Sequence, residues 1–222
     1  MHVLVTGVDE AGRGCVIGPL VVAGVLIKEE KLPVLTQLGV KDSKLLSAKK
    51  REALAVEIAG LAEQHLVVKL PPVEIDQAVE CKKKLYKLNR LEAQTMAKVI
   101  EALKPDVAYV DAADVLEERF ATHIREGLSF DAQIVAKHKA DKIYPVVSAA
   151  SIIAKVERDR EIALLAGKHG DFGTGYLADK RTTQFLRQCL QAHGEYPECV
   201  RKSWKPAKKI KAEFGSVQKK LV

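Results

Sequence analysis

The chain has 222 residues, of which 47% are hydrophobic and 29% are charged. A chain of this length and composition can bury a sizeable core, which argues against disorder over most of its length. The net charge is +7 and favours a polyanionic partner. Eight Lys or Arg residues against one Glu in residues 201–222 account for all of that charge. We call this segment the basic tail.

Three further classes are disfavoured by simple patterns. The longest apolar stretch, residues 16–27, is interrupted by Gly and Pro and falls short of the about 18 to 20 residues of a membrane span. No basic region precedes an apolar one at the N-terminus, so no secretory signal is expected. The four cysteines are scattered without a C-x-x-C pair, which disfavours a zinc ribbon or a disulfide framework. We therefore expect a cytoplasmic monomer without a membrane segment.

The secondary structure predicted along the chain starts with strands and continues with helices. Two β-branched runs, residues 2–8 and 20–27, are separated by glycines and a proline, which predicts an antiparallel hairpin. Ser47 is a good N-cap for a helix over residues 47–63. The remaining predicted elements are a strand over 66–70, helices over 71–79 and 85–103, a strand over 107–110, a helix over 115–126, a strand over 132–136, and helices over 145–166 and 182–193.

This order of elements predicts the fold class. Strands that come first and then alternate with helices indicate an α/β domain, in which helices cover a mixed sheet. Only the basic tail looks like an appendage, and its composition favours a helix. We therefore predict one domain over residues 1–200, followed by a helical tail over residues 201–222.

Carboxylates follow apolar strands at two places and precede a helix at a third. Asp9 and Glu10 follow the first strand, Asp111 ends a later one, and Asp141 stands just before the helix that Pro145 opens. If the two strands are neighbours about 4.8 Å apart, Asp9 and Asp111 lie side by side. Such carboxylates would repel one another unless they held hard divalent cations. The alternative is that each acid only caps a turn or faces solvent.

Six short motifs occur in order between residues 7 and 176, and together they resemble ribonuclease HII, the type 2 ribonuclease H, most closely its archaeal branch. The match itself runs from residue 7 to about residue 204. Each motif is weak alone, but the ordered combination is specific. The motifs are Gly7-Val-Asp-Glu-Ala-Gly-Arg-Gly14, Lys41-Asp-Ser-Lys44, Tyr109-Val-Asp-Ala-Ala-Asp114, His138-Lys-Ala-Asp141, Ser148-Ala-Ala-Ser151 and Gly173-Thr-Gly-Tyr176.

The resemblance implies an α/β, RNase H-like fold with a mixed five-stranded sheet flanked by helices. It implies an endonuclease that hydrolyses the RNA strand of RNA–DNA hybrids. It also implies that the enzyme cuts on the 5′ side of single ribonucleotides in duplex DNA and leaves 5′-phosphate and 3′-hydroxyl ends. Such an enzyme would act in ribonucleotide excision repair and DNA replication. The catalytic and metal-binding residues of the family, which would hold two Mg²⁺ or Mn²⁺ ions, match Asp9, Glu10, Asp111 and Asp141.

The same resemblance implies a set of substrate contacts. Gly12, Arg13 and Gly14 match the loop that contacts the 2′-hydroxyl and the flanking phosphate of the ribonucleotide. Tyr176 matches the tyrosine that packs on the sugar at the RNA–DNA junction, although its residue type alone fits core packing as well. Lys44 is a candidate phosphate contact, although lysines at a helix entrance often only face solvent.

Two other functions and two roles of the tail stay open at this stage. The chain could be a binding protein for hybrids that kept the fold without catalysis. It could also be a resolvase- or integrase-like nuclease that cuts DNA alone, because one fold hosts several chemistries. Trp204 and the lysines after it could form a basic strip on the duplex backbone. Alternatively, Trp204 anchors the tail to the core.

Overall fold

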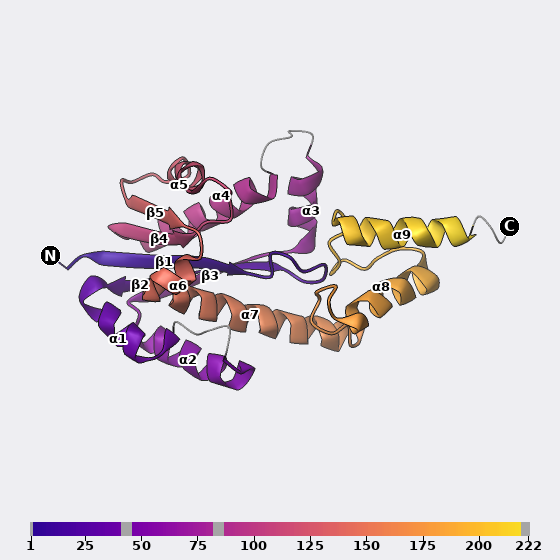
Figure 1. Cartoon of the computed structure of the whole chain (residues 1–222), viewed down its shortest axis with the longest axis horizontal. Coiled ribbons are helices and arrows are strands. Elements are labelled where there is room, and N and C mark those ends of the chain that lie inside the picture. Colours follow the sequence, from indigo (N-terminus) through magenta and orange to yellow (C-terminus); the bar gives the residue numbers. More distant parts are fainter. Residues whose placement is uncertain (1, 41–45, 82–86, 219–222) are drawn as a thin grey trace. The chain divides into compact units, whose positions relative to one another are not determined.

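The computed structural model describes residues 2–40, 46–81 and 87–218 (Figure 1). The described part has one five-stranded mixed sheet with the strand order β3-β2-β1-β4-β5. β1 is antiparallel to β2 and parallel to β4, and β4 is parallel to β5. The predicted hairpin and fold class are therefore confirmed. The strands are β1 (Leu4–Ala11), β2 (Leu20–Lys28), β3 (Gln64–Leu70), β4 (Val107–Asp111) and β5 (Gln133–Lys137).

Each predicted helix is present with somewhat different ends. Ser47 caps the second α-helix as expected, because its Oγ accepts a hydrogen bond from the N–H of Lys50 at 3.3 Å. The predicted start of a helix at residue 85 lies outside the described residues. The helices are η1 (Glu29–Lys31, a 3₁₀ turn), α1 (Leu32–Gln37), α2 (Ala48–Leu61), α3 (Pro72–Glu80), α4 (Lys87–Leu103), α5 (Glu117–Arg125), α6 (Ala140–Ile143), α7 (Pro145–His169), α8 (Lys180–His193) and α9 (Lys205–Gln218).

Two details of the prediction are wrong. The first strand does not end at residue 8, because its pairing with β2 continues to Ala11 opposite Val21. Asp9 and Glu10 therefore lie within β1 and not after it. The short helices η1, α1 and α6 were not predicted, since elements of three to six residues leave too few positions for a periodic pattern.

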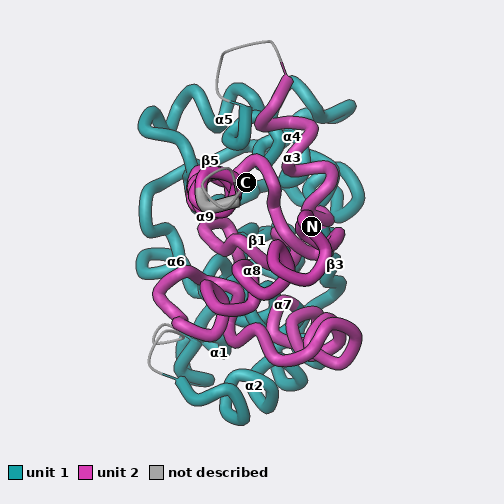
Figure 2. Tube along the Cα trace, turned by 90° about the vertical axis from the view of Figure 1, so that its right-hand side faces the viewer, with its two compact units in different colours: residues 1–11, 21–69, 86–157 teal, residues 12–20, 70–85, 158–222 magenta. Residues whose placement is uncertain are grey.

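The chain divides into two compact units, which Figure 2 shows in teal and magenta. Unit 1 contains residues 1–11, 21–69 and 86–157, and unit 2 contains residues 12–20, 70–85 and 158–222. The basic tail groups with the rest of unit 2 by its contacts. The division at residue 200 that the sequence suggests stays a prediction.

Unit 1 is built on the sheet, with an apolar cluster on each face. Alternate residues of β1 belong to different clusters, so that Val5 packs with α2 and the first half of α7, whereas Val8 packs with α4 and α5. Figure 1 shows α4 and α5 on one side of these strands and α2 on the other. The two clusters give each face of the sheet its own covering helices.

Unit 2 has a separate core that includes the start of the tail. Val16 and Ile17 pack with Phe172 and with residues of α8, and Ile17 forms an isolated bridge with Val200. Ala207 of α9 is fully buried in this cluster, and its carbonyl accepts a hydrogen bond from the Tyr196 hydroxyl at 2.9 Å. The start of α9 is thus part of the unit 2 core.

In the part of the chain that the structure describes, no helix is long and apolar enough to cross a membrane.

Gly7 permits the closest approach between a strand and a helix in unit 1. A Cβ atom at Gly7 would overlap the backbone carbonyl of Val146 and the nitrogen of Val147, at the start of α7. Because these are backbone atoms, neither can rotate away as a side chain could. The absence of a side chain at Gly7 therefore sets how closely α7 lies on β1.

We expect Gly7→Ala to lower the free energy of unfolding by about 3 kcal/mol or more, since the clash forces α7 away from the sheet. Gly60→Ala in α2 is the matched control, because nothing lies within 4 Å of a Cβ there. It should raise stability by about 0.5 to 1 kcal/mol. Urea unfolding of the three proteins measures both effects. Equal stability of Gly7→Ala and the wild type would show that α7 is not held against β1.

Candidate active site

Asp9 and Asp111 face each other across two neighbouring parallel strands. The register pairs Val8 with Val110, so the next residue along each strand places the two carboxylates on the same face of the sheet. Only 4% of Asp9 is exposed. Burial, and next the negative charge of Asp111, raise the pKa of Asp9 to about 7. The expected proximity of the two side chains is therefore present, in a buried setting.

Three groups stabilise the ionised form of Asp9. The Ser151 side chain hydrogen-bonds to it, and the N–H of Glu10 donates to its Oδ1 at 2.7 Å. The positive charge of Lys155 acts in the same direction, and its Nζ also donates to Ser151 Oγ at 2.6 Å. Ser151 belongs to a motif found in the sequence, but Lys155 was not identified from the sequence. Its i, i+4 spacing from Ser151 on one helix indicates that the two side chains can meet.

Asp141 lies near Asp111 through the short helix α6. The N–H of Ala140, the first residue of α6, donates to Asp111 Oδ1 at 2.9 Å. Asp141 is the next residue and is buried, and its backbone carbonyl accepts a hydrogen bond from Ser148 Oγ. The start of α6 therefore brings the position of Asp141 next to the Asp111 carboxylate.

Glu10 does not share the face of Asp9. It pairs with Val22, which belongs to the cluster under α4 and α5, whereas Asp9 pairs with Ala23 in the cluster under α7. Among the described residues, no three His, Cys, Asp or Glu side chains are grouped tightly enough to hold a metal ion. The four-ligand set thus stays a prediction.

A divalent cation nevertheless fits the Asp9 and Asp111 pair. A buried carboxylate beside a half-buried one supplies hard oxygen ligands and a repulsion that a cation would relieve. Burial and the charge of Asp111 raise the pKa of Asp9, and a bound cation would favour its ionised form.

The Gly12-Arg13-Gly14 segment opens unit 2 as a tight loop. The φ of Gly12 is 85°, and a Cβ there would meet the carbonyl oxygen of Pro19 at 2.7 Å, so the position requires glycine. Arg201 holds this loop, because its guanidinium donates to the carbonyls of Gly12 at 2.7 Å and Arg13 at 2.9 Å. Arg13 is half-buried and Gly14 is exposed.

Tyr176 lies beside this loop, within the same unit. The N–H groups of Val16 and Ile17 donate to the carbonyl of Gly175 at 2.8 and 3.2 Å, and a Cβ at Gly14 would lie 3.9 Å from the Tyr176 ring. The Arg158 guanidinium stands 4.8 Å from the centre of that ring. Burial raises the pKa of Tyr176, so its hydroxyl stays protonated at neutral pH. The structure thus brings together two of the substrate contacts that the resemblance implies.

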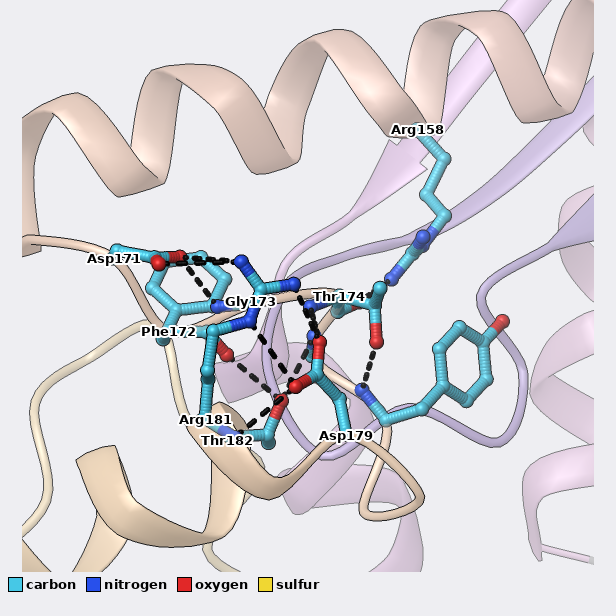
Figure 3. A network of polar contacts seen from close by, with 10 residues as sticks. Arg158, Asp171, Phe172, Gly173, Thr174, Asp179, Arg181 and Thr182 are labelled. Atoms are coloured by element: carbon cyan, nitrogen blue, oxygen red, sulfur yellow. Dashed lines mark hydrogen bonds and ion pairs between the residues drawn. The ribbon is translucent and has the colours of Figure 1, made fainter. Parts of the chain in front are cut away.

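A polar network around Asp179 fixes the loop that carries Tyr176 (Figure 3). Asp179 accepts from the N–H of Thr174 at 2.9 Å and pairs with Arg181, which also pairs with Asp171. Hydrogen bonds from Arg181 lower the pKa of Asp179 to about 2. Thr182 Oγ1 donates to the carbonyl of Phe172 at 2.8 Å. This segment is therefore held at several points by the start of α8.

Two other predicted contacts have different outcomes. Lys44 lies outside the described residues. Trp204 is half-buried, packs on the core of unit 2, and has the Arg201 guanidinium 5.0 Å from its ring centre. These contacts favour its role as an anchor of the tail.

The exposed lysines of α9 are Lys205, Lys208, Lys209 and Lys211, of which Lys208 pairs with Glu80 at 2.9 Å.

Comparison with known proteins gives consistent matches over nearly the whole chain. The family model described as Ribonuclease HII matches residues 6–207. Ribonuclease HII of Thermococcus kodakarensis is 49% identical over 217 residues, which cover 97% of this chain and 92% of the relative. The ribonuclease HII of Pyrococcus abyssi is 47% identical, and the match covers 96% of this chain and 94% of the relative.

Solved structures match in the same way. The crystal structure of ribonuclease H2 from Pyrococcus horikoshii has a TM-score of 0.87 at 44% identity, covering 96% of this chain and 99% of that one. The ribonuclease HII of Archaeoglobus fulgidus, solved in complex with PCNA, has a TM-score of 0.83 at 46% identity, with 91% and 96% covered. A Bst-RNase HIII structure with Mn²⁺ matches at 22% identity and covers 97% of this chain and 71% of its own. Its TM-score of 0.74 shows a shared fold.

The raised pKa of Asp9 predicts that Asp9→Asn stabilises the protein when no divalent cation is present. The folded state retains a proton on Asp9 that the unfolded state has lost, so wild-type stability falls as pH rises from about 4 to about 7. A difference of one in pKa between the folded and unfolded states corresponds to about 1.4 kcal/mol. The variant should therefore be more stable by a few kcal/mol above pH 7, and the gap should close near pH 4.

Chemical unfolding with a chelator at pH 4.5, 7 and 9 measures this gap. Asp114→Asn is the control with the opposite sign, because a hydrogen bond from Arg119 lowers the pKa of the buried Asp114. That variant should be less stable than the wild type at pH 7. A gap for Asp9→Asn that is the same at all three pH values would contradict the buried pair.

Proposed function

We propose that this chain, which belongs to the ribonuclease HII family, cuts duplex DNA on the 5′ side of single ribonucleotides as well as the RNA strand of hybrids. Members of the family are metal-dependent endonucleases that act on RNA–DNA hybrids. The proposal extends this shared activity to the isolated ribonucleotide. We place the enzyme in the cytoplasm as a monomer, in ribonucleotide excision repair and DNA replication.

The pair formed by buried Asp9 and half-buried Asp111 carries the catalytic part of the proposal. Together with Glu10 and Asp141, they would be the ligands of two Mg²⁺ or Mn²⁺ ions. When bound, such ions supply a water that is nucleophilic at neutral pH and stabilise the departing 3′-oxygen, which leaves 5′-phosphate and 3′-hydroxyl ends. Ser151 and the Glu10 N–H hold the Asp9 carboxylate in one orientation, so its oxygens are directed before metal arrives.

The loops of unit 2 carry the specificity part of the proposal. A single 2′-hydroxyl is what distinguishes a ribonucleotide from its neighbours in DNA. In Gly12-Arg13-Gly14, glycine permits close backbone approach while Arg13 supplies charge for the flanking phosphate. Tyr176 offers a protonated hydroxyl and a ring face beside Gly14, which suits packing on a sugar. Lys44 adds a phosphate contact in this proposal.

The decisive assay uses a labelled DNA duplex with one ribonucleotide, beside an all-DNA duplex and a long hybrid, with Mg²⁺, Mn²⁺ or a chelator. We expect metal-dependent cutting on the 5′ side of the ribonucleotide and no cutting of DNA alone. Asp9→Asn should lower the rate by about 100-fold or more, because it removes a ligand charge at the metal site. Asp131→Asn, which changes an exposed carboxylate, should leave the rate unchanged.

Each other result rejects a defined part of the proposal. Cutting of long hybrids alone would remove the roles given to Gly12-Arg13-Gly14 and Tyr176. Binding of hybrids without metal-dependent turnover would indicate a binding protein, and cutting of all-DNA would indicate a DNA nuclease. Full activity of Asp9→Asn would reject the assignment of the metal ligands.

The exposed lysines of α9 predict a salt-sensitive contribution to duplex binding. Removal of the helix would also remove buried Ala207, so neutralisation of Lys205, Lys209 and Lys211 to Gln is the cleaner change. The slope of log affinity against log salt should become shallower by up to about 0.9 for each phosphate that the variant no longer neutralises. Lys98→Gln, an exposed charge on α4, should leave the slope unchanged. An unchanged slope in the triple variant would assign α9 a purely structural role.

A further inference from the structure

Arg201 is a fully buried arginine whose side-chain hydrogen bonds all go to the loop of residues 12–18. Its Nη2, Nη1 and Nε donate to the carbonyl oxygens of Gly12 at 2.7 Å, Arg13 at 2.9 Å and Gly18 at 3.1 Å. Its own N–H also donates to the carbonyl of Val16 at 2.8 Å. Its partners are neutral carbonyls and not a carboxylate. A buried cation is costly unless its donors are all used, and apolar residues usually fill space at lower cost.

The direction of these hydrogen bonds determines where the other side of the loop points. A trans peptide group is planar, with its C=O and N–H in opposite directions, and the described chain has no cis peptide. Because the carbonyls of Gly12 and Arg13 point to Arg201, the N–H groups of Arg13 and Gly14 point away from it. Gly14 itself is exposed, and without a side chain it has no Cβ beside its N–H.

The surroundings of the loop support a precise backbone orientation. The carbonyl of Gly12 also accepts hydrogen bonds from the Sγ of Cys15 at 3.0 Å and from its N–H at 3.4 Å. Exposed Gly14 stands next to Tyr176. Two consecutive N–H donors beside an aromatic ring match a hydroxyl with an adjacent phosphate, next to a sugar that packs on the ring.

We propose that Arg201 is the positioning residue that directs the N–H groups of Arg13 and Gly14 toward the 2′-hydroxyl and phosphate of the ribonucleotide. Arg201 touches no substrate and acts through the carbonyls of the loop. The inference rests on the proposed function and deepens it, because it names what sets the specificity for ribonucleotides. Lysine cannot replace this arginine, since its single ammonium cannot reproduce the planar fork of donors.

The test compares Arg201→Lys with the wild type in a binding assay without turnover, in chelator. The duplexes are identical except for one 2′-hydroxyl. We expect the preference for the ribonucleotide duplex to fall about 10-fold or more, while affinity for the all-DNA duplex stays within about twofold. A purely structural role would lower both affinities together, through the active fraction. Arg125→Lys is the control, because that guanidinium donates to the carbonyl of Ile134 in unit 1.

A second measurement needs no variant and tests the contact between the Gly14 N–H and the 2′-hydroxyl, on which the inference depends, even if Arg201→Lys fails to fold. Hydrogen exchange at the Gly14 N–H of the wild type should slow on binding of the ribonucleotide duplex and not on binding of the all-DNA duplex. Equal exchange in both complexes, or an unchanged preference in a folded Arg201→Lys, would overturn the inference. A wild type with no preference for the ribonucleotide would reject the proposed function first, and the two failures are thereby distinguishable.

Discussion

The close packing of α7 on β1 at Gly7 is the contact on which unit 1 depends. It is possible because no side chain separates the strand from the backbone of Val146. The same packing brings Ser151 against Asp9, with Lys155 one turn further along the helix. Without Ser151 and Lys155, the Asp9 carboxylate would be buried beside Asp111 with few groups to stabilise its negative charge. The helix therefore does more than fill the core, because it makes a buried acidic pair tolerable in the folded protein.

Positive charge is used in two distinct ways in this chain. The exposed lysines of α9 give a diffuse field that favours any nucleic acid backbone. Arg158 and Arg201 are buried, and their guanidinium groups donate to loop carbonyls instead of facing solvent. The first kind of charge contributes affinity without reading sequence or sugar. The second kind fixes the orientation of the backbone, which is the property that recognition of a single hydroxyl requires.

The scaffold itself is shared far beyond close relatives. A Bst-RNase HIII structure with 22% identity matches at a TM-score of 0.74, which shows that the fold is shared at low identity. In general a fold hosts several functions, so specificity has to be argued from the site. Two loops of this chain are held in place by specific polar contacts: one by Arg201, and the other by Asp179 and Thr182 at the start of α8. Both loops belong to unit 2, whereas the carboxylates belong to unit 1. In the proposed function, specificity and catalysis are thus carried by different parts of the chain.

The sequence by itself determined the α/β class, the hairpin and most helices, because these follow from local periodicity and the order of elements. That Asp9 and Asp111 are neighbours depended on the pairing of β1 with β4, which could only be assumed from the sequence and which the structure supplied. Only the tertiary structure showed that Glu10 lies on the other face of β1, because that depends on how far β1 pairs with β2. It also decided the place of Arg201, which in the sequence looks like one more exposed charge of a basic tail. Its partner Arg13 lies 188 residues away along the chain, and no local pattern encodes a contact at that separation.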